Sequence, residues 1–284
     1  MRWNQNHRSG DVIDARGQGS PGGRGGLRLG LGGIVIVGIL SVVFRTNLFT
    51  LFDGGAPPSP GTSAARAPQR AANPQEDQQV RFVSFVLDDV QDNWTRIMPA
   101  LGRPYSRAQL VLFTDAINTG CGAADSTIGP FYCPSDQRVY IDLGFFRELR
   151  SRFGAPGDFA QAYVLAHEVG HHAQRLLGIE ERTRQAQAQN PSQENELSVR
   201  LELQADCFAG IWAKSTQQRN LLESGDLEEA LAATAAVGDD RIQRSAGRRV
   251  RPETWTHGSA QQRESWFRRG WSSGDPRQCD TFNQ

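Results

Sequence analysis

Two short motifs constrain this chain more than any other feature of its sequence. Residues 167–171 read His-Glu-Val-Gly-His, and residues 202–206 read Glu-Leu-Gln-Ala-Asp. Residues four apart lie on the same face of a helix, so His167 and His171 can direct both imidazoles toward one metal ion. Glu168 follows the first histidine, where its carboxylate can reach a water molecule on the metal without being a ligand itself. The first motif therefore predicts a zinc hydrolase in which Glu168 activates a zinc-bound water.

A catalytic zinc ion usually has three protein ligands and one open position, so a third ligand is needed. Glu202 in the second motif is the predicted third ligand, and Asp206 lies four residues later on the same helical face. Asp206 is expected to accept a hydrogen bond from the free ring N–H of a ligating histidine. The alternatives are an exposed Glu202 on a solvated helix and an Asp206 that caps a helix or pairs with an arginine. The sequence thus predicts one Zn²⁺ per chain, held by His167, His171 and Glu202.

Two further histidines follow these motifs in the sequence. His172 lies about 100° around the helix from the second ligand and is expected to pack at the cleft wall. His257 is a second candidate catalytic residue, because peptide hydrolysis needs a donor for the developing oxyanion. The alternative for His257 is a loop histidine that caps a helix beginning near Ser259. Tyr140 and Tyr163 are weaker candidates for the oxyanion role.

The N-terminal third has the composition of an anchor and tether rather than of an enzyme core. Residues 1–28 are polar, basic and glycine-rich, and residues 29–52 are mostly apolar, with 16 uncharged residues before Arg45. That run is slightly short for a transmembrane helix of about 20 residues, and flanking arginines can extend it. A cleaved signal peptide is the alternative, but no clear A-x-A cleavage site follows. Residues 53–79 are rich in Pro, Ala, Gly and Ser, and are expected to form a flexible linker.

The charge distribution predicts the orientation of this anchor. Arginines cluster before residue 29, whereas the segment after the span begins with Asp53. The positive-inside rule therefore places residues 1–28 in the cytoplasm. Residues 80–284 are then expected to form an extracytoplasmic zinc metallopeptidase domain, attached to the membrane by a single N-terminal span.

All four cysteines follow the predicted span, on the oxidising side of the membrane where disulfides persist. Four cysteines allow three connectivities. We expect Cys121 to pair with Cys133, closing a short loop, and Cys207 to pair with Cys279, tying the second motif to the C-terminal tail. The alternative for Cys207 is a buried thiol.

The remaining pattern predicts an α+β domain, mostly helical with a small sheet. Apolar residues recur at helical spacing in five segments: 80–101, 158–178, 191–212, 221–237 and 259–270. Residues 109–114 and 138–143 have the composition of strands. Asp158 is the expected N-cap of the first-motif helix, and Gly178 its stop. The strand at 139–143 is either an edge that pairs with an extended substrate or a buried core strand.

The charge balance, with 31 basic and 31 acidic side chains, does not predict a nucleic-acid partner. Five arginines between residues 241 and 251 form a local basic run. We expect a solvated surface there. The alternative is a rim that attracts acidic substrates or anionic lipid.

With these motifs the chain resembles the bacterial neutral zinc metallopeptidase family, which are single-span membrane proteins. The resemblance covers nearly the whole chain. It includes the segments that begin at Met1, Gly120, Pro130, Val139, His167, Glu202, His257 and Gly274. It implies a zincin-like metalloprotease fold and a gluzincin-like, zinc-dependent peptidase in a bacterial cell membrane, with a peptide or protein as its substrate.

The leading function is therefore a membrane-anchored zinc metallopeptidase, and an endopeptidase in particular. Two alternatives remain open at this point. One is a non-proteolytic zinc-binding scaffold that keeps the site for stability. The other is a zinc amidase that acts on cell-wall peptides, although no wall-binding module precedes the domain.

Overall fold

The structure is a computed structural model that describes residues 1–16, 73–151 and 154–283. Within these ranges, no helix is both long and apolar enough to cross a lipid bilayer. The predicted anchor, residues 29–52, and most of the predicted linker, residues 53–79, lie outside the described residues. The single span therefore stays a prediction.

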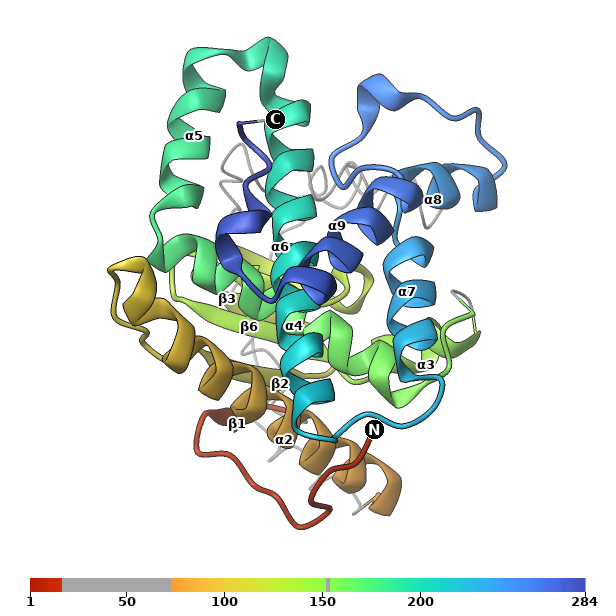
Figure 1. Ribbon diagram of the computed structural model, residues 1–284. Helices are drawn as coiled ribbons and strands as arrows, with labels where there is room; N and C mark the ends of the chain where they lie inside the picture. The colour runs from red at the N-terminus through yellow and green to blue at the C-terminus, as the bar shows by residue number, and fades with distance from the viewer. Residues whose placement is uncertain (17–72, 152–153, 284) are drawn as a thin grey trace, which may run out of the picture.

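Helices dominate the described part of the chain, and small sheets accompany them. The helices are α2 (Pro74–Ile97), α3 (Gly144–Ser151), α4 (Asp158–Leu176), α5 (Ile179–Gln189), α6 (Glu194–Gln218), α7 (Asp226–Ala236), α8 (Asp239–Ser245) and α9 (Ala260–Ser273). The strands are β1 (Val12–Asp14), β2 (Gln109–Phe113), β3 (Ala116–Thr119), β4 (Gly122–Asp125), β5 (Phe131–Cys133) and β6 (Arg138–Asp142). The predicted α+β class is confirmed (Figure 1).

Four strands form the main sheet in the order β1-β2-β6-β5, and β3 and β4 form a separate hairpin. β1 is parallel to β2, and β2 is parallel to β6, whereas β5 is antiparallel to β6. β6 is therefore an interior strand, and Val139, Tyr140 and Ile141 are almost fully buried. Of the two interpretations of residues 139–143, the core strand is correct, and the edge of the sheet on this side is β5.

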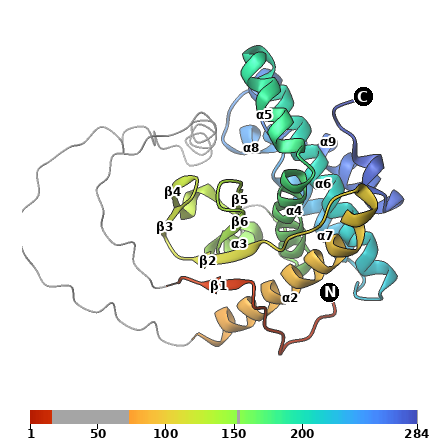
Figure 2. The same cartoon turned by 90° about the vertical axis from the view of Figure 1, so that its left-hand side faces the viewer.

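Residues 1–16 pack on the domain, although residues 1–28 were expected to lie apart from it. β1 extends the sheet beside β2 and close to α2 (Figure 2). Met1 is only 5% exposed, and the ring of Trp3 lies edge-on to Phe82 at 5.3 Å between centroids. β1 was not predicted because its apolar run is only Val12 and Ile13, which is too short to show the alternating pattern of a strand.

The helical part of the domain also begins earlier than expected. α2 starts at Pro74, six residues before the predicted boundary. The side chain of Asn73 caps it by accepting a hydrogen bond from the backbone N–H of Gln75. Proline suits the first helical position because it has no N–H to leave unpaired.

α4 lies at the centre of the domain, since α2, α6, α7 and β5 all pack against it. Figure 2 shows the sheet, α4, α6 and α9 in succession. The helix begins at Asp158 and its N-cap is Gly157, so the predicted N-cap was wrong by one position. Asp158 instead accepts a hydrogen bond from the amino group of Met1 at 2.7 Å. Gly178, with φ of 70°, follows the helix and ends it as predicted.

α6 and α9 pack closely because each presents a glycine to the backbone of the other. A Cβ atom at Gly210 would lie 2.1 Å from the carbonyl oxygen of Phe267. A Cβ atom at Gly270 would lie 1.9 Å from the carbonyl oxygen of Cys207. The two helices can approach this closely only because these side chains are absent, and the approach brings α9 behind the second motif.

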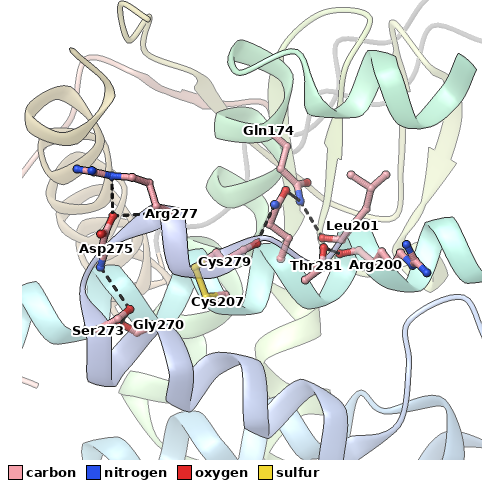
Figure 3. The surroundings of a disulfide bond; sticks show 11 residues. Gln174, Arg200, Leu201, Cys207, Gly270, Ser273, Asp275, Arg277, Cys279 and Thr281 are labelled. Atoms are coloured by element: carbon pink, nitrogen blue, oxygen red, sulfur yellow. Dashed lines mark hydrogen bonds and ion pairs between the residues drawn. A yellow bond between two sulfur atoms is a disulfide. The ribbon is translucent and has the colours of Figure 1, made fainter. Parts of the chain in front are cut away.

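Both predicted disulfides form, Cys121–Cys133 and Cys207–Cys279. The first ties the β3–β4 turn to β5. The second ties α6 to the segment that follows α9, as Figure 3 shows. Because Cys207 is the residue after Asp206, this bond also restrains the part of α6 that carries the second motif.

Candidate metal centre

Three side chains from α4 and α6 converge on one point. The Nε2 atoms of His167 and His171 lie 3.2 Å apart. Glu202 places Oε2 3.2 Å from the first of these nitrogens and Oε1 3.4 Å from the second. Donor atoms bound to a tetrahedral zinc ion, each about 2.0–2.1 Å from it, are separated by roughly 3.3 Å. The predicted ligand set therefore has both the chemistry and the spacing that zinc requires.

Hydrogen bonds orient both imidazoles toward this point. Asp206 Oδ1 lies 2.9 Å from His167 Nδ1, and Gln174 Oε1 lies 2.9 Å from His171 Nδ1. A carboxylate or amide oxygen only accepts, so each Nδ1 is the donor and each Nε2 is left for a metal ion. Asp206 thus lies beside a candidate metal ligand, His167, as predicted. Gln174 was not predicted, although it lies three residues after His171 on the same helix face.

Asp206 also forms an ion pair with the buried Arg263. It therefore has both of the predicted roles, orienting a histidine ring and pairing with an arginine. Arg263 donates from Nε to Oδ2 at 2.8 Å and from Nη2 to Oδ1 at 3.0 Å. The hydroxyl of Tyr163 donates to Oδ1 at 2.5 Å. Asp206 is fully buried, and Arg263 is 2% exposed. This pair forms the floor behind the three candidate ligands.

The close approach of α4 and α6 depends on the glycine within the first motif. A Cβ atom at Gly170 would lie 3.2 Å from the carbonyl oxygen of Ala205 and 3.3 Å from its Cα. Such contacts are tighter than nine in ten real Cβ contacts, so the facing backbone of α6 would have to move by a few tenths of an ångström to admit a side chain. The glycine therefore lets Glu202, one helical turn before Ala205, approach the histidines.

The electrostatics of the site favour a bound cation. Burial alone would lower the pKa of His167, but Asp206 and then Glu202 raise it to about 10. The pKa of His171 is also raised, because the Glu202 carboxylate outweighs the effect of burial. Burial raises the pKa of Glu168, against the opposing effect of the two histidines. A pocket that stabilises protons on its imidazoles offers the same stabilisation to a metal ion that replaces them.

A cleft of about 370 Å³ opens over the site. Glu168 is 8% exposed and lines this cleft together with His167 and His171. The edge strand β5 contributes Phe131 and Tyr132 to the same cleft. Much of the remaining wall is apolar and is formed by Ile128, Pro130, Phe145, Val164, Leu201, Val237 and Ile242. Glu168 therefore faces a space in which an apolar part of a substrate could lie.

His257 lines the same cleft, so the structure brings it to the candidate ligands despite its distance in sequence. Its Nδ1 lies 3.4 Å from Asp239 Oδ1 and 3.2 Å from Thr256 Oγ1. Burial would lower its pKa, but Glu202 and Asp239 raise it above the ordinary value. The N-terminus of α9 is capped by Ser259 in a capping box, so His257 does not act as the cap.

The remaining candidates from the sequence, His172, Tyr140 and Tyr163, lie in three different surroundings. His172 is fully buried, with Nδ1 3.0 Å from the Tyr132 hydroxyl and Nε2 2.7 Å from the carbonyl oxygen of Ser106. It therefore packs behind the cleft wall and away from the ligands. Tyr140 donates its hydroxyl to Asp136 and is not among the residues that line the cleft. Tyr163 does line the cleft, and its hydroxyl donates to Asp206.

A second group of acidic side chains, Asp158, Asp226 and Glu229, is also close enough to hold a cation. The amino group of Met1 lies 2.7 Å from Asp158 and 3.4 Å from Asp226. Glu229 accepts a hydrogen bond from the backbone N–H of Phe159. The positive charge beside this group is thus supplied by the chain itself, and we assign no metal to it.

Comparison with known proteins identifies one family and several relatives in bacteria. Residues 1–282 match the model of the family described as "Putative neutral zinc metallopeptidase". An Escherichia coli K12 protein, "Uncharacterized protein YpfJ", is 48% identical over 295 residues, which cover all of this chain and 99% of that protein. A Mycobacterium tuberculosis H37Rv protein, "Uncharacterized protein Rv2575", is 48% identical over 201 residues, which cover 67% of this chain and 66% of that protein. No solved structure matches.

Proposed function

Since the chain belongs to the neutral zinc metallopeptidase family, we propose that it hydrolyses peptide bonds at the site between α4 and α6, as an endopeptidase with one zinc ion. His167, His171 and Glu202 would hold the ion. The observation that carries this proposal is the convergence of two oriented Nε2 atoms and a carboxylate within 3.4 Å of one another. When bound, zinc supplies a Lewis acid that polarises the scissile carbonyl and lowers the pKa of water.

Glu168 acts as the general base in this proposal. Its carboxylate removes a proton from the attacking water and delivers that proton to the departing amine. The raised pKa of Glu168, caused mainly by burial, suits both steps because the proton is neither held too weakly nor released too slowly.

His257 stabilises the developing oxyanion. Its raised pKa keeps a proton on the ring, and the contact of Nδ1 with Asp239 leaves Nε2 as a donor. Arg263 also lines the cleft, and we assign it a positioning role because it binds Asp206 and lies 3.7 Å from Glu202.

The cleft favours an extended peptide as the substrate. β5 is an edge strand, and Phe131 and Tyr132 within it line the cleft. An edge strand offers unpaired backbone groups to which an extended chain can add. The apolar wall supplied by Val164, Val237 and Ile242 fits an apolar side chain next to the scissile bond.

Attachment to a bacterial cell membrane through residues 29–52 stays a prediction. Two disulfides support a location of the metal site outside the cytoplasm, because such bonds persist in oxidising compartments.

Cleavage mapping with a peptide library tests the activity. The full chain is purified with zinc and compared with Glu168→Gln, and products are identified by mass spectrometry. The full chain is needed because a fragment that begins at residue 80 would lack β1 and the first six residues of α2. Glu196→Gln, the same chemical change at a largely exposed position on α6, is the matched control.

We expect cuts from the wild type and from Glu196→Gln, with a loss of at least about 100-fold in Glu168→Gln, the usual range for a lost general base. All three proteins should retain zinc. Cuts that persist at full rate in Glu168→Gln would overturn the assignment of the base. A folded, zinc-loaded wild type that cuts no peptide would instead favour the non-proteolytic zinc scaffold.

A further inference from the structure

The N-terminal segment is joined to the domain by backbone pairing. β1 pairs with β2 in parallel register, with Val12, Ile13 and Asp14 opposite Leu110, Val111 and Leu112. At the ends of this ladder, the N–H of Leu110 donates to the carbonyl oxygen of Asp11, and the N–H of Ala15 donates to that of Leu112, both at 2.8 Å. Without β1, β2 would become an edge strand with a row of unpaired backbone groups.

Charged side chains reinforce this pairing. Arg107, just before β2, donates to Asp11 at 2.5 Å and also to Asp88 and Asp92 on α2. His7 contributes a further contact, with Nε2 2.7 Å from Asp88 Oδ2. One arginine of the domain thus binds both the N-terminal segment and α2.

The segment also reaches the helix that carries the first motif. The Met1 amino group binds the carboxylates of Asp158 and Asp226, which are the first residues of α4 and α7. The N–H of Arg2 donates to the carbonyl oxygen of Leu221 at 2.7 Å. Residues 1–16 are therefore bound to the sheet, to α2 and to the starts of two central helices.

These contacts restrict how the chain can be arranged across a membrane. Strands of one sheet lie in one compartment, so the ends of the segment from residue 17 to residue 72 lie on the same side of any membrane that it enters. Residues 29–52 number 24, too few for two transmembrane helices of about 20 residues each. A docked β1 and a single crossing by residues 29–52 are therefore mutually exclusive.

We propose that residues 1–16 and residues 73–283 lie on the same side of the membrane, and that this side is outside the cytoplasm. The compartment follows from the two disulfides, which belong to an oxidising environment. This arrangement differs from the cytoplasmic N-terminus predicted from the positions of the arginines. The positive-inside rule is statistical, and here it is outweighed by a strand pairing and by ion pairs that join the segment to α2, α4 and α7. The proposal is independent of peptide hydrolysis.

Thiol labelling in intact cells tests the proposal. The four native cysteines are all disulfide-bonded, so an added cysteine is the one free thiol of the chain. Gln5→Cys and Ser192→Cys are prepared separately in the full chain, and both positions are exposed, so folding should be unaffected. Cells with a permeabilised outer membrane are treated with a membrane-impermeant maleimide before or after lysis. A cytoplasmic protein with an exposed thiol is the control for leakage.

We expect both variants to be labelled before lysis, to an extent that agrees within about twofold. Labelling of Ser192→Cys before lysis and of Gln5→Cys only after lysis would overturn the proposal and restore the single crossing. Labelling of both only after lysis would keep the shared side but overturn the assignment to the exterior. None of these outcomes depends on whether the protein cuts peptides.

Discussion

Replacing Asp206 by asparagine tests how the floor of the metal site is built. The side chain is fully buried and receives four donors: Arg263 Nε and Nη2, the Tyr163 hydroxyl and His167 Nδ1. Asparagine has the same shape but offers one oxygen, so its amide nitrogen would face the N–H group of Arg263 or His167. The buried guanidinium would also lose its nearest counter-charge and retain only Glu202, at 3.7 Å.

The expected loss of stability is large. Breaking a buried ion pair by removing one partner costs about 3–5 kcal/mol, because a charge remains buried without compensation. For a domain of this size, each kcal/mol lowers the melting temperature by about 2–4 °C, so a decrease of about 6–20 °C is expected. Zinc affinity should also fall about 10–100-fold, as is usual when the partner of a ligating histidine is lost.

Two measurements check these values: thermal unfolding of the metal-free full chain and zinc titration against a competing chelator. Asp77→Asn, the same change at an exposed position in the first turn of α2, should cost less than about 1 kcal/mol. The double variant Asp206→Asn with Arg263→Met should be more stable than the sum of the single changes predicts, because neither charge remains. A loss below about 1 kcal/mol in Asp206→Asn, with unchanged zinc affinity, would refute the reasoning.

Three further predictions concern the contact between α4 and α6, the second disulfide and the protons released on zinc binding. Gly170→Ala should weaken zinc binding and cost about 1–3 kcal/mol, because the new methyl group meets the carbonyl oxygen of Ala205; chelator competition and thermal unfolding would show both effects. Replacing Cys207 and Cys279 together by serine should cost about 4 kcal/mol in denaturant unfolding, since the bond closes a loop of 72 residues. Zinc binding should release protons and weaken as the pH falls from about 10, the raised pKa of His167, toward 6.5; calorimetry in buffers of different ionisation enthalpy measures this release.

Each of these outcomes has a result that contradicts it. Gly10→Ala, where a new Cβ has open space, is the control for Gly170→Ala, and equal effects of the two would contradict the helix-contact argument. An unfolding midpoint that does not change without the second disulfide would show that the C-terminal segment is held by packing alone. A zinc-binding enthalpy that is the same in every buffer would mean that the imidazoles are already unprotonated.

The candidate ligands could be predicted because their geometry is local. His167 and His171 lie one helical turn apart, so spacing alone places them on one face. Arg263 could not be found in this way, since it is 57 residues from Asp206 and its role depends on how closely α9 packs on α6. Gln174 could have been found, because it lies one turn from His171 and amide oxygens commonly orient such rings.

β1 and its place in the sheet were not predicted, because its partner strand lies far away in the sequence. β1 has only two apolar residues in sequence, and its partner in β2 begins about 95 residues later, a separation at which a single sequence gives no pairing signal. The edge strand β5 was missed as well, because Phe131–Cys133 is too short to show an alternating pattern. Tertiary contacts, rather than local preference, decide the position of both strands.

The position of β1 in the sheet also has a consequence for biosynthesis. A ribosome makes Asp14 about 100 residues before it completes β2 at Phe113, which at about 5–20 residues per second is a delay of roughly 5–20 s. The apolar residues 29–52 emerge within that interval. They can therefore meet a membrane or a chaperone before β2 exists, so the first strand of the sheet to be made has to wait for its partner.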